Sequence, residues 1–243
     1  MLKVSLFIPC LTDQFFPDSG MRMLRVLERL GHEVSYDPRQ TCCGQPAFNT
    51  GYHHEAETLA RKFLDIFDRD GAEYIVAPSG SCVTMVAQFY GRMLELPAPY
   101  AEAADRVRGR VREFTSFLVD VLGVTDVGAH FAERVTVHDS CHALRELRIK
   151  RQPRALLERV EGLELVEMDA AEVCCGFGGT FAVKYADVSA AMAEEKVDSI
   201  IRSGATVVTG VDSSCLMQID GMLRRRGSSV RTLHIAEILG SIS

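Results

Sequence analysis

All eight cysteines of this 243-residue chain fall into two copies of one pattern. Matching cysteines lie 131 (141 − 10) to 133 (215 − 82) residues apart, which indicates a tandem duplication. Four thiolates satisfy a tetrahedral Zn²⁺ ion or a four-iron cluster, so the pattern predicts one metal site per copy. The predicted ligands are Cys10, Cys42, Cys43 and Cys82 in the first copy, and Cys141, Cys174, Cys175 and Cys215 in the second.

The spacing within each copy bears on the kind of metal site. A zinc finger uses two short Cys-x-x-Cys knuckles, and neither copy contains one. The ligands come from three separate segments instead, which suits an object larger than a single ion. Adjacent cysteines in a strand point to opposite faces, so both reach one centre only where the backbone turns. Gly44 and Gly176, which follow the two pairs, supply that freedom, and we place them beside the cofactor.

An even number of cysteines is also typical of a secreted disulfide framework. Two observations oppose this reading: the N-terminal MLKVSLFIPCLTDQ lacks a cleavable signal, and a chain of this length with 47% hydrophobic residues can bury a core without staples. We therefore expect a reducing, cytoplasmic setting. No apolar run approaches the ~20 residues of a membrane span. The net charge of −6 offers no general attraction to nucleic acid.

The elements needed to position the cysteines follow the same repeat. Short β-branched runs at 4–9 and 135–138 lead to the first cysteine of each copy, and strands at 33–36 and 163–166 lead to each pair. Long amphipathic helices are predicted at 55–67 and 189–201. Strands that alternate with helices imply parallel βαβ units. We therefore predict an α/β protein with two similar Rossmann-like lobes, 1–128 and 129–243, each built on a parallel sheet.

These motifs resemble the CCG-domain (cysteine-rich domain) family. The resemblance covers almost the whole chain and includes the string CCGFGGTFAVKY at 174–185. Members include a subunit of heterodisulfide reductase and the iron–sulfur subunits of glycolate oxidase, and the chain is most similar to members that serve lactate utilization. The resemblance implies an iron–sulfur electron-transfer subunit, with one or two 4Fe-4S clusters, in a system that oxidises L-lactate to pyruvate. Such a chain would work with other iron–sulfur subunits as part of an oxidoreductase complex, and the sequence identifies no catalytic residue.

The chain departs from the family pattern at two positions. Where the final Cys-x-x-Cys of the family has its first cysteine, this chain has Ser79 and Asp212. The open clusters of heterodisulfide reductase therefore do not carry over. Asp212 is either an oxygen ligand or a helix cap, and zinc in one lobe stays open.

Other residues near the motifs have roles that the sequence only suggests. His138 and His142 flank Cys141, and we interpret them as hydrogen-bond donors to sulfur in preference to ligands. Gly178 and Gly179 are expected to let the backbone approach the cofactor closely.

Two hypotheses from other functional classes remain beside the iron–sulfur one. The first is a zinc-binding structural or interaction module, and the second is a thiol–disulfide redox protein that uses the cysteine pairs directly.

Overall fold

The structure is a computed structural model that describes residues 1–242. The chain divides into two compact units, Met1–Phe114 and Thr115–Ser243, called here the first and second lobes. The lobe boundary that the sequence predicts, at residue 128, stays a prediction.

The first lobe is built on a four-stranded parallel sheet with the strand order β2-β1-β3-β4. Its strands are β1 (Lys3–Leu6), β2 (Glu33–Tyr36), β3 (Tyr74–Ala77) and β4 (Val111–Glu113). The helices are α1 (Cys10–Phe15), α2 (Pro17–Arg29), α3 (Gln45–Asn49), α4 (His53–Phe67), α5 (Gly80–Thr84) and α6 (Ala98–Arg108), with a π-helical turn, η1 (Met85–Phe89).

The second lobe repeats this plan with the strand order β6-β5-β7-β8, again all parallel. Its strands are β5 (Arg134–His138), β6 (Glu164–Leu165), β7 (Val207–Gly210) and β8 (Arg231–His234). The helices are α8 (Cys141–Arg145), α9 (Arg151–Leu157), α10 (Phe181–Lys184), α11 (Ala186–Arg202), α12 (Ser213–Arg225) and α13 (Ile235–Leu239). The short α7 (Phe114–Ser116) and the π-helical η2 (Phe117–Val121) precede them.

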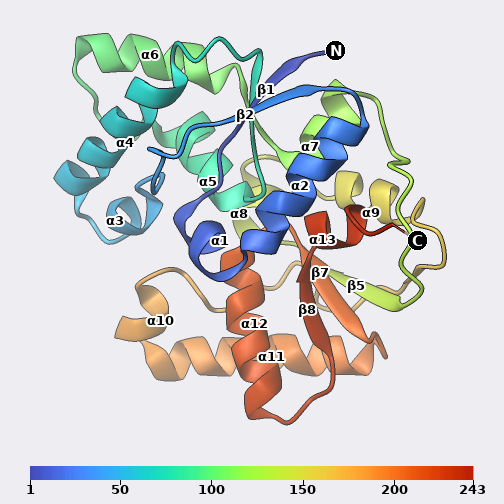
Figure 1. The fold of residues 1–243 in the computed structure, drawn as a ribbon. Coiled ribbons are helices and arrows are strands. Elements are labelled where there is room, and N and C mark those ends of the chain that lie inside the picture. Colours follow the sequence, from blue (N-terminus) through green and yellow to red (C-terminus); the bar gives the residue numbers. More distant parts are fainter. Residues whose placement is uncertain (243) are drawn as a thin grey trace. The chain divides into compact units, whose positions relative to one another are not determined.

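The matching strand orders confirm the predicted fold class. Both sheets are parallel, and in both the first strand of the copy lies between the second and third. Figure 1 labels β1 and β2 of the first sheet and β5, β7 and β8 of the second. The duplication seen in the cysteines is therefore a duplication of the fold, with two similar Rossmann-like α/β lobes.

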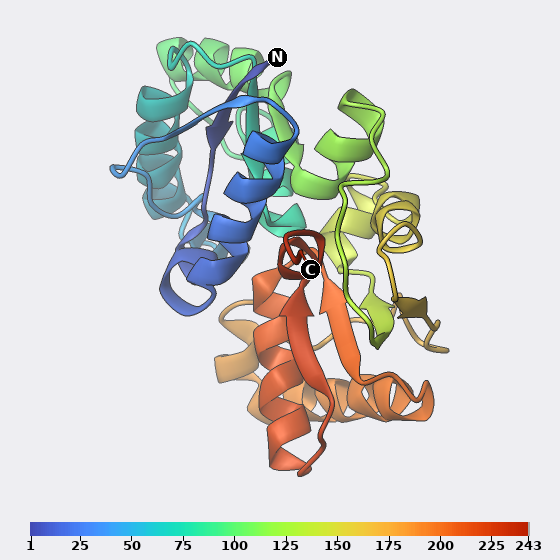
Figure 2. The same cartoon turned by 45° about the vertical axis from the view of Figure 1, so that its right-hand side comes forward.

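Apolar patterning explains how the helices cover the sheets. In α2, the buried residues Met23, Val26 and Leu27 recur at helical spacing, and the helix is followed by Gly31 at a φ of 81°. This helix lies on one face of the first sheet, whereas α4 and α6 pack together on the other (Figure 2). In the second lobe α11 packs against α12, which also contacts β7 and β8. Parallel sheets need such cover because both of their faces are apolar.

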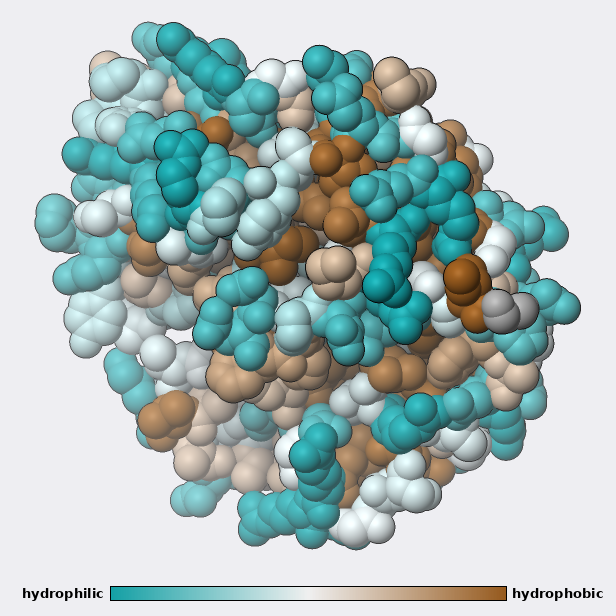
Figure 3. Space-filling model, viewed as in Figure 1, coloured by the Kyte–Doolittle hydropathy of each residue, from teal (hydrophilic) through white to brown (hydrophobic). Residues whose placement is uncertain are grey.

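The surface mixes polar and apolar side chains. On the face seen in Figure 3, hydrophilic residues are prominent and apolar ones are scattered among them, which is normal because apolar atoms form more than half of a folded protein's accessible surface. Within residues 1–242, none of the helices combines the length and apolar composition needed to cross a membrane.

Candidate metal centre

The four cysteines of the first lobe converge at the carboxyl edge of its sheet. Cys10 opens α1 directly after β1, Cys42 and Cys43 follow β2, and Cys82 lies in the first turn of α5 after β3. Hydrogen bonds link the thiols of Cys10 and Cys42, of Cys42 and Cys43, and of Cys43 and Cys82. The structure thus brings all four predicted ligands of this copy together.

The electrostatics of this group favour one shared negative charge. Hydrogen bonds from the Cys10 and Cys43 thiols, and from the Gly44 N–H at 3.4 Å, lower the pKa of Cys42 to about 3. The same hydrogen bond to Cys42, together with burial, raises the pKa of Cys10. The pKa of the fully buried Cys43 rises for like reasons. A thiolate held by neighbouring thiols is a ready ligand for a cation, which would displace their protons.

Local backbone geometry turns both members of the pair toward the same centre. Gly44 adopts a φ of 87°, a left-handed conformation that favours glycine, and it immediately precedes α3. The hydroxyl of the buried Tyr90 donates to the Cys43 carbonyl at 2.6 Å, and this hydrogen bond holds the turn in place.

The second lobe repeats the arrangement with its own four cysteines. Cys141 opens α8 after β5, Cys174 and Cys175 follow β6, and Cys215 lies in the first turn of α12 after β7. Hydrogen bonds link the thiols of Cys141 and Cys174, of Cys174 and Cys175, and of Cys175 and Cys215. All eight cysteines of the chain are free thiols.

The second group also concentrates negative charge on the first member of its pair. Hydrogen bonds from Cys141 and Cys175, and from the Gly176 N–H at 3.4 Å, lower the pKa of Cys174 to about 2. The hydrogen bond to Cys174 raises the pKa of Cys175. The two lobes therefore share one electrostatic design.

The turn after this pair is more tightly enclosed than its counterpart. Gly176 has a φ of 86°, and a Cβ atom there would lie 2.6 Å from the Ser189 carbonyl oxygen. The Ser189 hydroxyl donates to the Gly176 carbonyl at 2.8 Å and accepts from the Gln218 amide at 2.9 Å. Gly178 and Gly179 also have positive φ values, of 53° and 66°, and they precede α10. Their predicted role beside a cofactor stays a prediction.

Ser79 and Asp212 occupy matching positions but make different contacts. The Ser79 hydroxyl caps α5 by accepting from the Cys82 N–H at 3.3 Å. Asp212 is at the N-cap position of α12, where the described chain shows no side-chain cap hydrogen bond; its carboxylate instead accepts from the Ser140 hydroxyl at 2.5 Å. The charge of Asp212 also contributes to the raised pKa of Cys141, so the carboxylate lies near the sulfur group.

Two buried side chains distinguish the second lobe. His138 ends β5, and burial lowers its pKa to about 3. Lys196 is fully buried in α11, and its ammonium donates to the carbonyls of Ala170 and Ala171, just before the cysteine pair. Burial lowers the pKa of Lys196 to about 8, against the attraction of Cys175 and its neighbours, so the side chain is charged at pH 7. His142, which also flanks Cys141, has its Nδ1 3.7 Å from the Cys141 sulfur.

The corresponding positions of the first lobe are aromatic. Phe7 precedes Cys10 by three residues, as His138 precedes Cys141. The turns at Gly44 and Gly176 lie against Ala56 and Ser189, which therefore match in the two lobes. Seven residues after these positions stand Phe63 in the first lobe and Lys196 in the second. Phe7 and Phe63 pack edge to face with their centroids 4.8 Å apart. Sequence analysis missed Lys196, although an alignment of the two copies would have shown a lysine opposite an apolar residue.

These observations test whether the cysteines suit a metal centre. Each lobe brings four sulfur donors to one edge of its sheet, and none of them is in a disulfide. Two of the four lie in the first turns of helices, where backbone N–H groups favour negative charge. In the second lobe His138 joins Cys175 and Cys215 in a buried group of donors. The donor set fits a soft or borderline metal.

Comparison with known proteins finds one family twice in the chain. The model of the cysteine-rich domain family, CCG, matches residues 4–87 and again residues 135–220. The chain belongs to this cysteine-rich domain family. Each match spans one complete set of four cysteines, so the family domain occurs twice.

Relatives within the family match over nearly their full lengths. The lactate utilization protein A of Exiguobacterium sp. is 47% identical over 239 residues, 98% of this chain and 97% of its own. That of Macrococcus caseolyticus is 48% identical over 99% of this chain and 97% of its own, and that of Bacillus subtilis is 43% identical over 99% and 100%. Among solved structures, a putative Asp/Glu racemase from Yersinia pestis covers 99% of this chain and 96% of its own at 13% identity, with a TM-score of 0.38, too low to bear on function.

Proposed function

We propose that this chain is an iron–sulfur electron-transfer subunit that serves the oxidation of L-lactate to pyruvate. The observation that carries the proposal is the convergence of four free thiols at one sheet edge in each lobe. The names of the relatives, which match over nearly the whole chain, support the link to lactate. The relatives' names do not state an iron–sulfur cofactor; that part rests on the sulfur geometry and on the family resemblance.

In this proposal the residues of the chain hold and shield the cofactor. The eight cysteine sulfurs are its ligands, and the buried Cys43 and Cys175 exclude water from one side. An iron–sulfur cluster, when bound, takes up and releases single electrons. The glycine turns at Gly44 and Gly176 let the backbone approach closely and point an N–H at sulfur, an interaction that tunes such clusters.

The same proposal assigns the lactate chemistry to partners. Oxidation of lactate to pyruvate removes two electrons and two protons, and a chain whose recognised chemistry is sulfur ligation would accept electrons from another subunit. We therefore propose other iron–sulfur subunits of the lactate system as partners. Eight free thiols fit a reducing compartment, and we propose the cytoplasm.

The deciding experiment is metal and sulfide analysis of protein purified without oxygen. We expect iron and acid-labile sulfide in similar amounts, with a broad visible absorbance. Cys174→Ser or Cys175→Ser should remove most of that absorbance if the second lobe holds the more secure cluster, and Cys43→Ser is the matched variant of the first lobe. Stoichiometric zinc without iron or sulfide would contradict the proposal and favour a structural module.

A further inference from the structure

His138 is a buried imidazole, and neither of its ring nitrogens makes a well-formed hydrogen bond within the described chain. The residue is 2% exposed. Leaving a buried polar atom unpaired costs about 1–3 kcal/mol. A side chain in this state at the end of a buried strand indicates that a partner absent from the polypeptide satisfies it.

The surroundings of His138 identify the nature of that partner. One ring nitrogen of His138 and the sulfurs of Cys175 and Cys215 all lie within 4.8 Å of one another. Tetrahedral bonds of about 2.0–2.1 Å to nitrogen and about 2.3 Å to sulfur put neighbouring donor atoms roughly 3.5–3.8 Å apart. The three donors therefore lie close enough to contact one metal atom with small adjustments of their side chains.

A backbone carbonyl also lies near the ring, as is common for a metal-bound histidine. Such residues usually direct their second nitrogen at a backbone carbonyl or carboxylate, which fixes the ring. The Ala171 carbonyl lies near the imidazole and opposes the lowering of its pKa. This carbonyl is itself held in place, since it accepts from the Asp139 N–H at 3.0 Å and from the Lys196 ammonium at 3.1 Å.

The first lobe lacks this donor. Phe7 occupies the position of His138, and its ring packs against Phe63 and Phe67 with centroid distances of 4.8 and 5.7 Å. A phenyl ring offers no ligand atom. The first lobe therefore has only sulfur donors at the position where the second has sulfur and nitrogen.

We propose that His138 is a nitrogen ligand of the metal centre in the second lobe, so that the two lobes hold centres with different ligand sets. The inference rests on the part of the proposed function that makes Cys175 and Cys215 ligands. Around a single ion the three donors would share one metal atom, whereas in a four-iron cluster, in which each iron takes one protein ligand, His138 would take the place of one cysteine. The inference replaces the hydrogen-bonding role that the sequence alone favours for this residue.

The test uses Co²⁺ as a spectroscopic probe of the ligand atoms. The full chain carrying Cys42→Ser and Cys43→Ser, which disable the first site, is prepared metal-free without oxygen and titrated with Co²⁺. X-ray absorption should then show sulfur together with one imidazole nitrogen around cobalt. A shell of sulfur alone would overturn the proposal without the use of any further variant.

Two histidine variants in the same background make the assignment specific. His138→Phe, which installs the residue of the first lobe, should remove the nitrogen shell and weaken Co²⁺ binding by at least about tenfold, as loss of even an outer partner commonly does. His142→Phe, which removes the other histidine beside Cys141, should keep the nitrogen shell. A nitrogen shell that persists in His138→Phe would also overturn the proposal.

The outcomes separate this inference from the proposed function. Protein that lacks iron and sulfide but shows the nitrogen shell contradicts only the iron–sulfur function. Protein that contains iron and sulfide but shows sulfur alone around cobalt contradicts only the role of His138.

Discussion

Single residues next to the sulfur groups carry roles that their positions in the pattern do not reveal. Ser79 and Asp212 stand at the same place in the two copies, yet Ser79 caps its helix and Asp212 accepts from Ser140. The difference arises because the residue before Cys141 is Ser140, whose hydroxyl donates to Asp212. The residue before Cys10 is Pro9, which has no hydroxyl. A carboxylate held in this way has less freedom to reach a metal.

The contact with Ser140 leads to a prediction for Asp212. Asp212→Ala should lower the free energy of unfolding of the metal-free protein by about 1–3 kcal/mol, because the buried Ser140 hydroxyl loses its charged acceptor. Urea unfolding measures the loss, and Ser140→Ala should account for much of it in a double-mutant cycle. Ser79→Ala, which removes a cap, should cost about 1 kcal/mol. Cluster spectra that change in both Asp212→Ala and Asp212→Cys would instead make Asp212 a ligand.

At the scale of elements, the turn after each cysteine pair sets the directions in which the two paired sulfurs point. The two turns share a left-handed glycine, but only the second is enclosed so closely that a methyl group does not fit. A Cβ at Gly44 would lie 3.1 Å from the Ala56 carbonyl oxygen, a distance that a small shift relieves. The 2.6 Å approach at Gly176 leaves no such room.

This difference predicts a graded series of alanine variants. Gly179→Ala has open space around its Cβ and should cost only the left-handed strain, about 1–2 kcal/mol. Gly44→Ala should cost slightly more, and Gly176→Ala most, because α11 must move away from the turn. Unfolding free energies and Co²⁺ affinity measure the series. Equal losses at Gly176 and Gly179 would show that strain, and not enclosure, decides.

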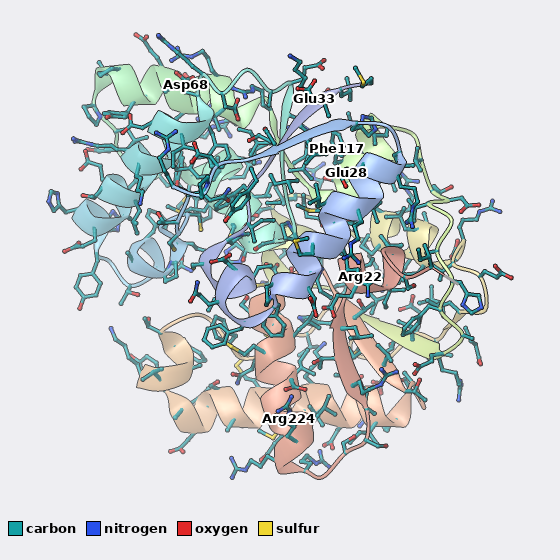
Figure 4. The ribbon with its side chains drawn as sticks, in the orientation of Figure 1. Arg22, Glu28, Glu33, Asp68, Phe117 and Arg224 are labelled. Carbon is teal, nitrogen blue, oxygen red and sulfur yellow. The ribbon has the colours of Figure 1, made fainter. Side chains whose placement is uncertain are left out.

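An ion pair between two helices of the first lobe predicts the response to acid. Asp68, labelled in Figure 4, follows α4 and receives two hydrogen bonds of 2.8 Å from Arg106 of α6, which lower its pKa. A lowered folded pKa means stability that is present above the unfolded value of about 3.9 and is lost as the pH falls through the folded value. Arg106 is half exposed, so screening by solvent keeps this contribution small.

The variant Asp68→Asn tests this effect. It should lower the urea midpoint at pH 7 and reduce the further loss between pH 5 and pH 2 relative to the parent. An unchanged midpoint at pH 7 would mean that the ion pair makes no net contribution.

Much of this element-scale arrangement could be predicted from the sequence. The β-branched runs, the two long amphipathic helices and the repeated cysteines led to parallel strands with the sulfurs at their ends, as found. The burial of the residues that lie near the sulfurs, Lys196 above all, could not be predicted in the same way. Lys196 lies within an amphipathic helix, where a lysine usually indicates a solvated face, and only packing against Ala170 and Ala171 reveals its burial.

At the scale of the whole molecule, the chain is a duplication in which the four cysteines stayed alike and the residues near them diverged. Both lobes keep four thiols, a glycine turn and the same strand order. At two matching buried positions, one lobe has Phe7 and Phe63, and the other has His138 and Lys196. An exchange of one lobe for the other would therefore preserve the four cysteines but not their environment.

The buried ammonium of Lys196 should make the electron affinities of the two lobes differ. A fixed positive charge stabilises whichever state of a neighbouring centre is more negative, and reduction adds one negative charge. If each lobe holds an iron–sulfur centre, as proposed above, we expect an electron to favour the second lobe over the aromatic-lined first. Lys196→Met should shift the reduction potential of the second centre to a more negative value, and the exposed Lys184→Met should leave it in place; an unmoved potential in Lys196→Met would mean that this charge does not steer the electron.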